Sequence, residues 1–312
     1  MMQDLFVGVD IAKDWLDIHH PNRQPFRIAN TAEAARRLAG SCLREGVWVI
    51  FEATGGYDRT LRDALERVGA PFSRVNPRQA RDFARAMGVI GKTDRVDARM
   101  LAEFGARLRP AQTEPVAPPR RALQALVTRR RQLVEMRKQE VTRLKQTHGA
   151  VARADIRSLM AVLERHIQRI EARIVRLIGA APALAETARR LQTVPGVGLI
   201  VTATLLAEMP ELGQLDRRRI AALAGLAPVA RDSGQLRGKR MIRGGRPAVR
   251  TMLYIAALHA SRLCATFRTF RQRLIGAGKP IKVVLTATAH KLLGILNAMV
   301  ASDTDFCIEQ PG

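Results

Sequence analysis

Residues 5–20, LFVGVDIAKDWLDIHH, decide the fold of the N-terminal part of the chain. Apolar and polar residues alternate around a β-rich run, which predicts a first strand that is prone to form a hairpin. Residues 47–52, VWVIFE, are almost continuously apolar, which is typical of a strand buried on both faces. We predict another strand at 26–29, helices over 32–45 and 59–68, and a short strand within residues 71–77. This order predicts an α/β domain with helices packed on a sheet.

The middle of the chain is predicted to be helical. Helix dominates from residue 78, with a break at Gly88 and Gly91 before KTDRVDARMLAEF (residues 92–104). Residues 110–119 contain four prolines and form the one clear linker. Beyond the linker, apolar residues recur at steps of four and three, which predicts an antiparallel helical hairpin or coiled coil; an ordinary bundle core is the alternative. These residues are Ile156, Met160, Leu163, Ile167, Ile170, Ile174 and Leu177.

The last part of the chain begins with a turn between two predicted helices, Pro195-Gly196-Val197-Gly198. This pattern is typical of a helix-hairpin-helix, in which Gly196 and Gly198 let backbone N–H groups approach a phosphate. A tight interhelical turn without a ligand would use the same residues. After a loop dense in glycine and charge, residues 231–250, helices over 249–261 and 281–300 complete a mostly helical domain. We therefore predict three domains, at residues 1–112, 113–188 and 189–312.

The net charge of +24, from 52 Lys and Arg against 28 Asp and Glu, indicates a polyanionic partner. The charge is unevenly distributed. Residues 1–114 carry 18 basic and 15 acidic side chains, residues 115–190 carry 17 and 6, and residues 191–312 carry 17 and 7. The first block keeps its carboxylates, whereas the other two have the charge of a polyanion-binding surface. This division predicts catalysis in the first block and binding in the others.

Other features of the sequence argue against a membrane or secreted protein. No apolar stretch approaches the roughly 20 residues that span a bilayer, and the acidic N-terminus MMQDLFVGVD lacks the basic region of a signal peptide. Cys42, Cys264 and Cys307 are too far apart for a zinc or redox motif. We expect unpaired thiols in a reducing, bacterial cytoplasm, with the protein associated with the nucleoid and no membrane partner.

Four acidic residues are the candidate metal ligands. Asp10 lies inside an apolar strand, where a charge is costly unless it is paired or binds a metal, and Glu52 ends the buried second strand. Asp94 and Asp97 are three residues apart on one helix face and are able to share an ion. Each has a structural alternative: Asp94 as a helix N-cap, Asp97 in an ion pair with an arginine, and Glu52 as a solvated strand end. The four together predict a site for Mg²⁺ or Mn²⁺.

Several ordered motifs resemble one protein family. GVDIAKDWLD, FEATGGY, VNPRQARDFARAMG and GKTDRVDARMLAEF are similar to the N-terminal domain of DEDD transposases of the insertion-sequence one-ten family, which are related to pilin-gene invertases. That domain resembles RuvC, a junction resolvase with an RNase H-like fold. The C-terminal motifs LQTVPGVG, AALAGLAPVARDSGQLRGKRMIRGGRPAVR and CATFRTFRQRL extend the resemblance over nearly the whole chain.

The resemblance implies a transposase or recombinase that cuts and rejoins donor and target DNA. Its acidic quartet falls on the four residues named above, and its serine nucleophile falls on Ser233 in ARDSGQLRG. Basic residues around this serine could clamp a scissile phosphate; they are Arg231, Arg237, Lys239, Arg240, Arg243 and Arg246. The family further implies a non-coding bridge RNA as guide, and a homo-oligomer, a dimer or tetramer, in which subunits share the active site.

Four alternative functions remain open from the sequence. A metal-dependent junction nuclease would use water as the nucleophile and leave Ser233 idle, and a site-specific DNA invertase would use the same chemistry on paired sites. An actin-like ATPase would need a second glycine-rich motif, for which only RGGR in a basic loop is available. A nucleoid-binding protein would account for the charge but not for Asp10 in an apolar strand.

Overall fold

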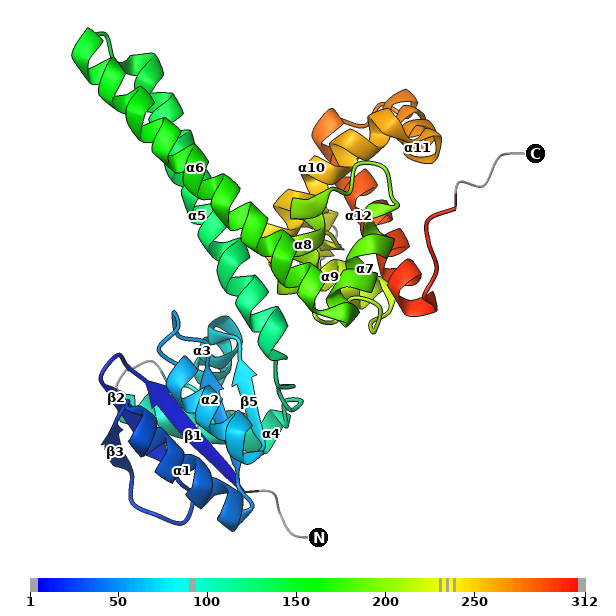
Figure 1. Cartoon of the computed structure of the whole chain (residues 1–312). Coiled ribbons are helices and arrows are strands. Elements are labelled where there is room, and N and C mark those ends of the chain that lie inside the picture. The colour runs from blue at the N-terminus through cyan, green and yellow to red at the C-terminus, as the bar shows by residue number, and fades with distance from the viewer. Residues whose placement is uncertain (1–4, 90–93, 230–231, 234–235, 238–239, 308–312) are drawn as a thin grey trace. The chain divides into compact units, whose positions relative to one another are not determined.

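The computed structural model describes residues 5–89, 94–229, 232–233, 236–237 and 240–307, with the side chains of residues 94, 95, 229, 232, 233, 236 and 237 outside this description. The chain forms two compact units, Met1–Pro115 and Val116–Gly312 (Figure 1). The N-terminal unit is α/β and the C-terminal unit is mostly helical, so the predicted fold class, α/β followed by α, is confirmed at this level. The division into three domains stays a prediction.

A five-stranded mixed sheet forms the centre of the N-terminal unit, in the order β3-β2-β1-β4-β5. The strands are β1 (Phe6–Ile11), β2 (Trp15–His19), β3 (Phe26–Ala29), β4 (Trp48–Glu52) and β5 (Phe72–Val75). The first three are antiparallel neighbours, whereas β1, β4 and β5 run parallel. The stretch 5–20 therefore forms the predicted hairpin of β1 and β2. Because β1, β4 and β5 are parallel, their carboxyl ends meet at one edge of the sheet.

The two faces of the sheet bury different helices. These are α1 (Ala32–Glu45), α2 (Arg59–Val68), α3 (Pro77–Ala86) and α4 (Asp94–Leu108). Side chains alternate between the faces along each strand. Val49 and Phe51 pack with α1 and α2, whereas Ile50 packs with α4. Helix α3 attaches to the second face by its Phe83, whose ring meets that of Phe104 edge-on at a centroid distance of 5.3 Å.

Two glycines allow α4 to lie directly against the sheet. A Cβ atom on Gly8 of β1 would lie 1.9 Å from the Ala98 carbonyl oxygen and 2.5 Å from the Ala102 amide nitrogen. A Cβ atom on Gly105 would lie 2.6 Å from the Ile50 Cγ1 atom. Only residues without a Cβ fit at such contacts. Because Gly105 lies near the start of the strands and Ala98 lies further along β1, the N-terminal end of α4 reaches their carboxyl ends.

The predicted linker is partly bound to the edge of the sheet. The Thr113 amide donates to the Phe72 carbonyl oxygen at 2.8 Å, and the Arg74 amide donates to the Thr113 hydroxyl at 2.8 Å. The segment after α4 thus covers part of edge strand β5, whose backbone groups would otherwise be open to pairing with another chain.

The C-terminal unit begins with a long pair of helices, α5 (Pro118–Gln146) and α6 (Ala150–Ala180), which lie side by side in Figure 1. Its further helices are α7 (Pro182–Gln192), α8 (Leu199–Glu208), α9 (Arg217–Ala224), α10 (Pro247–Leu263), α11 (Ala265–Gly276) and α12 (Ile281–Ser302). Leu163 and Ile167 of the predicted apolar seam are buried against Leu133 of α5. Ile174 is buried in the main core of the unit. The described part of the seam therefore packs within the chain.

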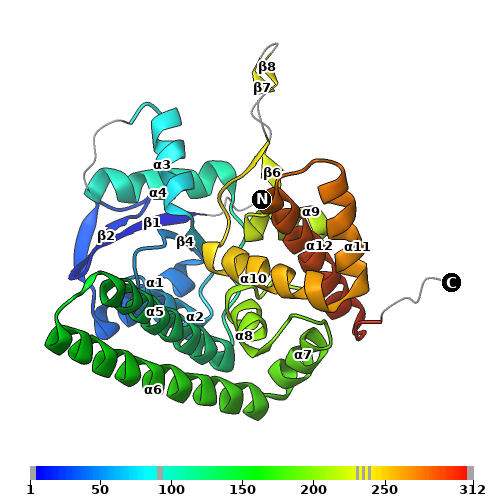
Figure 2. The same ribbon diagram turned by 90° about the horizontal axis from the view of Figure 1, so that it is seen from above.

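The expectation that no stretch is long and apolar enough to cross a bilayer was wrong for α12. Within the described residues, this helix alone has the length and hydropathy of a membrane span, but half of the apolar window is buried inside the unit. Leu292, Leu293 and Leu296 are fully buried in the main core. Figure 2 shows α12 between α9, α10 and α11. Its apolarity is explained by its place as a core helix.

Two short β-ribbons replace the predicted loop between α9 and α10. Strands β6 (Pro228–Val229) and β9 (Met241–Ile242) pair antiparallel, and so do β7 (Asp232–Ser233) and β8 (Leu236–Arg237). In Figure 2, β7 and β8 stand away from the helices of the unit.

Candidate functional site

Asp10 and Glu52 lie side by side at the carboxyl ends of two neighbouring strands. Strands β1 and β4 pair with Val9 opposite Phe51, so the next residues along them are Asp10 and Glu52. Val9 and Phe51 point into the core beneath α1 and α2. Because side chains alternate, the two carboxylates point to the face that carries α3 and α4.

Helix α4 brings a third predicted carboxylate to this place. Asp97 precedes Ala98, whose carbonyl oxygen lies against Gly8, two residues before Asp10 on β1. Asp10, Glu52 and Asp97 line one cleft with a volume of about 550 Å³. Asp94 is the first residue of α4, one helical turn before Asp97, but its side chain lies outside the described residues. Three residues far apart in the sequence thus line the same cleft.

The same cleft is lined by two arginines that the sequence analysis did not select. Arg81 and Arg85 of α3 are exposed and line this cleft together with the sheet residues. With Arg78, they recur at steps of three and four within VNPRQARDFARAMG, which places them on one side of a helix. This periodicity was the signal that could have identified them. Cations beside carboxylates suit a site that must hold a phosphate as well as a metal ion.

A further carboxylate, Asp17, faces Asp10 across the β1–β2 pair. Its side chain is only 6% exposed and accepts two hydrogen bonds from Arg27 of β3, from Nε at 3.0 Å and from Nη2 at 2.8 Å. Directly opposed carboxylates repel each other across a sheet. The guanidinium of Arg27 offsets the charge of Asp17 and so reduces its repulsion of Asp10.

The donor set of the cleft fits a hard divalent cation, because carboxylate oxygens are the ligands that Mg²⁺ prefers. As the described side chains are placed, no three His, Cys, Asp or Glu groups converge closely enough to hold a metal ion. The metal centre and its four ligands therefore remain a proposal.

The structure places the predicted serine on a β-ribbon. Ser233 of β7 pairs with Leu236 of β8, and Asp232 pairs with Arg237. The side chains of Ser233 and Arg237, and the whole of Arg231 and Lys239, lie outside the described residues. The nucleophile thus stays a prediction, on a backbone that the structure does describe.

The three remaining basic residues near the serine differ in their surroundings. Arg240 and Arg243 are exposed. Arg246 instead donates to both carboxylate oxygens of Glu211, at 2.6 and 2.7 Å, and to the Glu208 carbonyl oxygen at 2.7 Å. This pairing lowers the pKa of Glu211, because the hydrogen bond from Arg246, its charge and a backbone hydrogen bond outweigh the upward effect of burial. It gives Arg246 a structural role that the sequence analysis did not predict.

The predicted helix-hairpin-helix glycines are placed between α7 and α8. Gly196 has a φ of +92°, and a Cβ atom there would lie 2.5 Å from the Ala260 amide nitrogen of α10. Close packing against α10 is thus sufficient reason for a glycine at this position. Gly198 precedes α8, and a Cβ atom there would meet nothing within 4 Å. A phosphate contact stays a prediction for both residues.

Comparison with known proteins defines the class of protein first. A family model described as "Transposase", of the DEDD type, matches residues 7–148, and one described as "Transposase IS116/IS110/IS902 family" matches residues 188–272. The fold, the acidic cleft and these matches define an enzyme of DNA recombination or transposition, whose substrate is DNA. The chain belongs to the IS110 family of insertion-sequence transposases.

The curated relatives are consistent with this family. The chain is 28% identical to the pilin gene-inverting proteins of Moraxella bovis and Moraxella lacunata over 325 aligned positions, which cover 98% of each chain. It is also 37% identical over 114 residues to an insertion element IS900 protein of Mycobacterium paratuberculosis, covering 35% of this chain and 28% of that protein.

Proposed function

We propose that this transposase cuts and rejoins DNA by means of a carboxylate-held divalent metal, Mg²⁺ or Mn²⁺, and a serine nucleophile. The observation that carries the proposal is the cleft lined by Asp10, Glu52 and Asp97, which come from two strand ends and one helix. In the proposal, Asp94 completes the set of ligands, since it is one helical turn from Asp97. The strand order and the antiparallel β2 support an RNase H-like fold for the N-terminal unit.

Each group of residues has a separate task in this proposal. A bound divalent ion would neutralise the charge that develops on the phosphate oxygens during strand transfer. The carboxylates hold that ion, and Gly8 keeps α4 close enough for Asp97 to take part. Arg81 and Arg85 contact non-bridging phosphate oxygens of the bound DNA.

The serine chemistry of the proposal has two balanced steps. The Ser233 hydroxyl oxygen attacks a DNA phosphodiester, its bond to phosphorus forms, and the bond from phosphorus to one strand breaks. The departing strand oxygen receives the proton that the serine gives up. In the second step a hydroxyl of the new strand attacks the phosphoseryl bond and returns the serine to its starting form. The covalent link conserves bond energy for rejoining.

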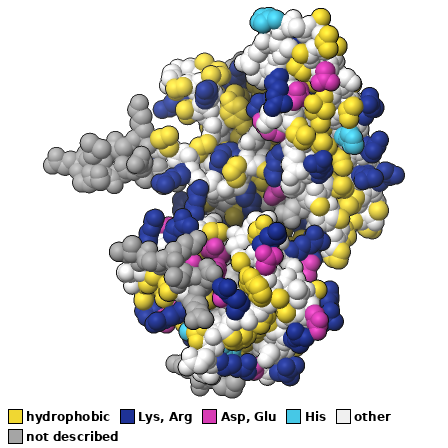
Figure 3. All heavy atoms as spheres, turned by 90° about the vertical axis from the view of Figure 1, so that its left-hand side faces the viewer, with side chains coloured by type: hydrophobic (Ala, Val, Ile, Leu, Met, Phe, Trp, Pro, Cys, Tyr) yellow, Lys and Arg dark blue, Asp and Glu magenta, His cyan; other side chains and the backbone are white. Residues whose placement is uncertain are grey.

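The proposal includes a guide RNA and an oligomer. The C-terminal residues 115–312 hold most of the net charge, which suits binding of a folded RNA through its phosphates. On the face shown in Figure 3, Lys and Arg side chains are spread over both parts of the molecule. Base pairing by the RNA would supply the choice of donor and target. Sequencing of the RNA that copurifies with the protein tests this part, and the absence of any enriched non-coding species contradicts it.

The metal site is tested with charge-removing variants at unchanged shape. We expect Asp10→Asn and Glu52→Gln to reduce recombination of a two-site plasmid at least about 100-fold. They should also weaken Mn²⁺ binding measured by calorimetry. Asp14→Asn is the matched control, because Asp14 is an exposed acid four residues after Asp10. Normal Mn²⁺ binding by both variants would contradict the metal site even if recombination were lost.

The nucleophile is tested by trapping the covalent link. End-labelled DNA incubated with the protein and denatured should leave label attached to the wild-type chain and not to Ser233→Ala. Ser158→Ala is the control, since Ser158 is exposed on α6. If Ser233→Ala still cuts DNA and no labelled chain appears with either protein, water is the nucleophile and the nuclease alternative is correct.

A second candidate function is site-specific inversion of DNA. It is favoured by the pilin gene-inverting relatives, which match over 98% of their length. A plasmid with two inverted sites distinguishes the two functions. An invertase exchanges the sites within one molecule, whereas a transposase joins the element to a new target.

A further inference from the structure

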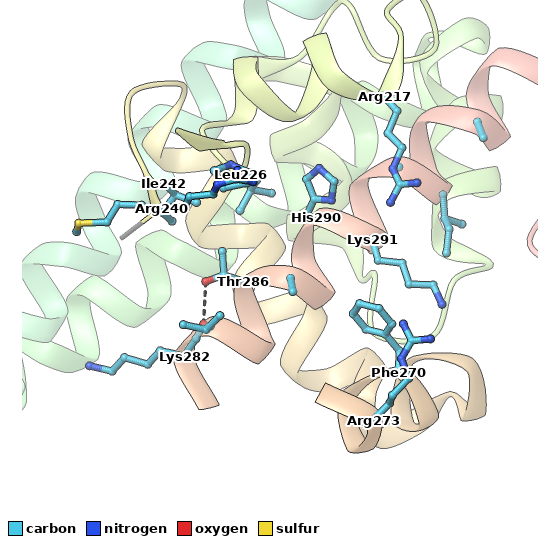
Figure 4. Close-up of a pocket in the computed structure, with 17 residues that line it drawn as sticks. Arg217, Leu226, Arg240, Ile242, Phe270, Arg273, Lys282, Thr286, His290 and Lys291 are labelled. Carbon is cyan, nitrogen blue, oxygen red and sulfur yellow. Dashed lines mark hydrogen bonds between the residues drawn. The ribbon is translucent and has the colours of Figure 1, made fainter. Parts of the chain in front are cut away.

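The C-terminal unit contains a second and larger cleft, far along the sequence from the acidic residues. It has a volume of about 920 Å³ and lies over α12, between α11 and strand β9. This volume is near the upper end of the range for ligand pockets, about 300–1,000 Å³. Figure 4 shows its labelled side chains surrounding one face of α12. Of its lining residues, only Arg240 is among the basic residues predicted to clamp the scissile phosphate, and the proposed metal and serine steps use none of the others.

The floor of the cleft is a stripe of small and apolar residues on α12. Val283, Ala287, His290, Gly294 and Ala298 line it and recur at steps of three and four, so they share one side of the helix. The pKa of His290 is lowered by burial and then by Arg217, so its imidazole is neutral at pH 7. The floor therefore carries no formal charge.

The rim of the cleft is cationic. It is lined by Arg217, Arg240, Arg273, Lys282 and Lys291, and no acidic side chain that the structure describes lines it. Among the described residues, none of these five forms an ion pair, although acidic partners hold many of the other arginines, as Glu211 holds Arg246. Four of these cations are exposed and Lys291 is half-buried. Five cations gathered around one opening, without acidic partners among the described residues, indicate an anionic ligand.

The aromatic ring of Phe270 lies beside two cations of the rim. The Arg273 guanidinium carbon lies 5.3 Å from the centre of the Phe270 ring, and the Lys291 ammonium nitrogen lies 4.8 Å from it. Figure 4 shows these three side chains together at one end of the cleft. At the other end, Met241 is 62% exposed and Ile242 is 37% exposed. The half-buried Phe270 at one end and the exposed Met241 and Ile242 at the other are suited to contacts with flat, apolar groups.

We propose that this cleft binds an unpaired segment of a DNA strand, with bases on the apolar floor and phosphates on the cationic rim. The proposal rests on the proposed function, because strand transfer exposes unpaired DNA. Duplex DNA presents its phosphates outward and stacks the faces of its bases inside the helix, so those faces could not contact an apolar floor. A single strand exposes both its phosphates and the faces of its bases. Proteins usually bind single strands through aromatic rings next to basic residues.

A second copy of the chain is a less suitable occupant. The C-terminal residues 191–312 carry 17 basic and 7 acidic side chains, so an identical surface would be repelled by the rim. The Thr286 hydroxyl, which lines the cleft, already donates to the Lys282 carbonyl oxygen of its own helix at 2.8 Å. It therefore does not require a hydrogen-bond acceptor from a second chain.

Equilibrium binding with catalysis excluded tests the proposal. The full-length protein is titrated without divalent metal against a labelled oligothymidylate and against a blunt duplex of equal length. We expect Phe270→Leu to weaken binding of the single strand about tenfold, with the salt dependence unchanged, because one stacking contact is lost. Lys291→Gln should weaken it as well and reduce the slope of log Kobs against log salt by about 0.7, because one phosphate contact is lost.

The matched control is Arg262→Gln, which removes one exposed charge from α10, outside the cleft. It should leave single-strand binding within about twofold of wild type. Thermal denaturation identifies a variant that fails to fold, and Lys291→Gln, at a rim position, serves if Phe270→Leu fails.

Three results with the Phe270→Leu and Lys291→Gln variants would overturn the inference. The first is an equal loss of affinity for single strand and duplex, and the second is a loss of affinity for a matched oligouridylate RNA alone. The third is unchanged affinity for the single strand together with an altered mass of the protein in light scattering. The last would assign the cleft to a second copy. Because no metal is present, loss of binding here is separable from failure of the metal site or of Ser233.

Discussion

Replacing Gly8 with alanine is expected to inactivate the acidic cleft without touching any of its side chains. The added Cβ atom would lie 1.9 Å from the Ala98 carbonyl oxygen, where ordinary contact needs about 3.4 Å. Helix α4 and strand β1 must therefore separate by about 1.5 Å, the difference between these distances. Displacements of about 1 Å at a reacting centre cost on the order of 100-fold in rate. We expect recombination by Gly8→Ala to fall by at least this factor.

The stability of the same variant should fall less steeply than its activity. Overpacking in a core costs about 1–3 kcal/mol, which lowers the melting temperature of the N-terminal unit but leaves it folded at 25 °C. Recombination is measured in a plasmid assay at that temperature, and unfolding is followed by circular dichroism. Weaker Mn²⁺ binding in calorimetry would show that the ligand from α4 has moved.

Two other glycines serve as graded controls. In Gly105→Ala the new atom meets side-chain carbons of Ile50 and Phe6 at 2.6 and 2.7 Å, away from the cleft, so it should destabilise with a smaller loss of activity. In Gly40→Ala, within α1, the nearest atom is the end of the Arg44 side chain at 3.5 Å, so stability should rise by up to about 1 kcal/mol. Full recombination by a folded Gly8→Ala protein would refute the argument that the packing of α4 sets the site.

Three further predictions follow from contacts in the two units. The double variant Arg81→Gln, Arg85→Gln should reduce recombination about 10- to 100-fold while Mn²⁺ binding in calorimetry stays within a few-fold; loss of metal binding instead would give these arginines a structural role. Glu211→Gln should lower the free energy of unfolding by about 1–2 kcal/mol at pH 7, because it loses the charge that Arg246 binds. The pKa of Glu211 is lowered from 4.5 in the folded protein. In urea titrations, the difference in unfolding free energy between the wild type and Glu211→Gln should therefore be full above pH 4.5 and be lost as the pH falls below 4.5 through the lowered folded pKa. Burial raises the pKa of the Cys42 thiol to about 11, so iodoacetamide at pH 8 should label it only on unfolding, as mass spectrometry would show.

Local signals explain why many elements could be predicted to the residue. The helix over 32–45 begins after Thr31, whose hydroxyl accepts from the Ala34 amide, and ends at Gly46, whose φ is +63°. The helix over 59–68 ends at Gly69, whose φ is +74°. Caps of this kind act within one helical turn, so they are readable from neighbouring residues. The β-ribbons between α9 and α10 have no such signal and were not predicted.

The carboxylates were predictable for a similar reason, because an acid within an apolar strand is costly wherever the strand lies. The partners of the arginines were not predictable from the sequence. Nothing within a few residues of Arg246 indicates that Glu211 holds it, since the two are 35 residues apart. Arg81 and Arg85 show helical spacing, but only the packing of α3 by Phe83 against Phe104 directs them to the cleft.

The sequence by itself determined the class of fold, the four acidic candidates and the basic character of the C-terminal part, because strand alternation, helix caps and net charge are local or additive properties. Only the tertiary structure decided that Asp10, Glu52 and Asp97 share a cleft, that Gly8 permits it, and that α12 carries a second cleft with a cationic rim. Such facts depend on which surfaces approach across dozens or hundreds of residues. Packing at that range is set by the shape of the whole core and leaves no pattern in any one segment.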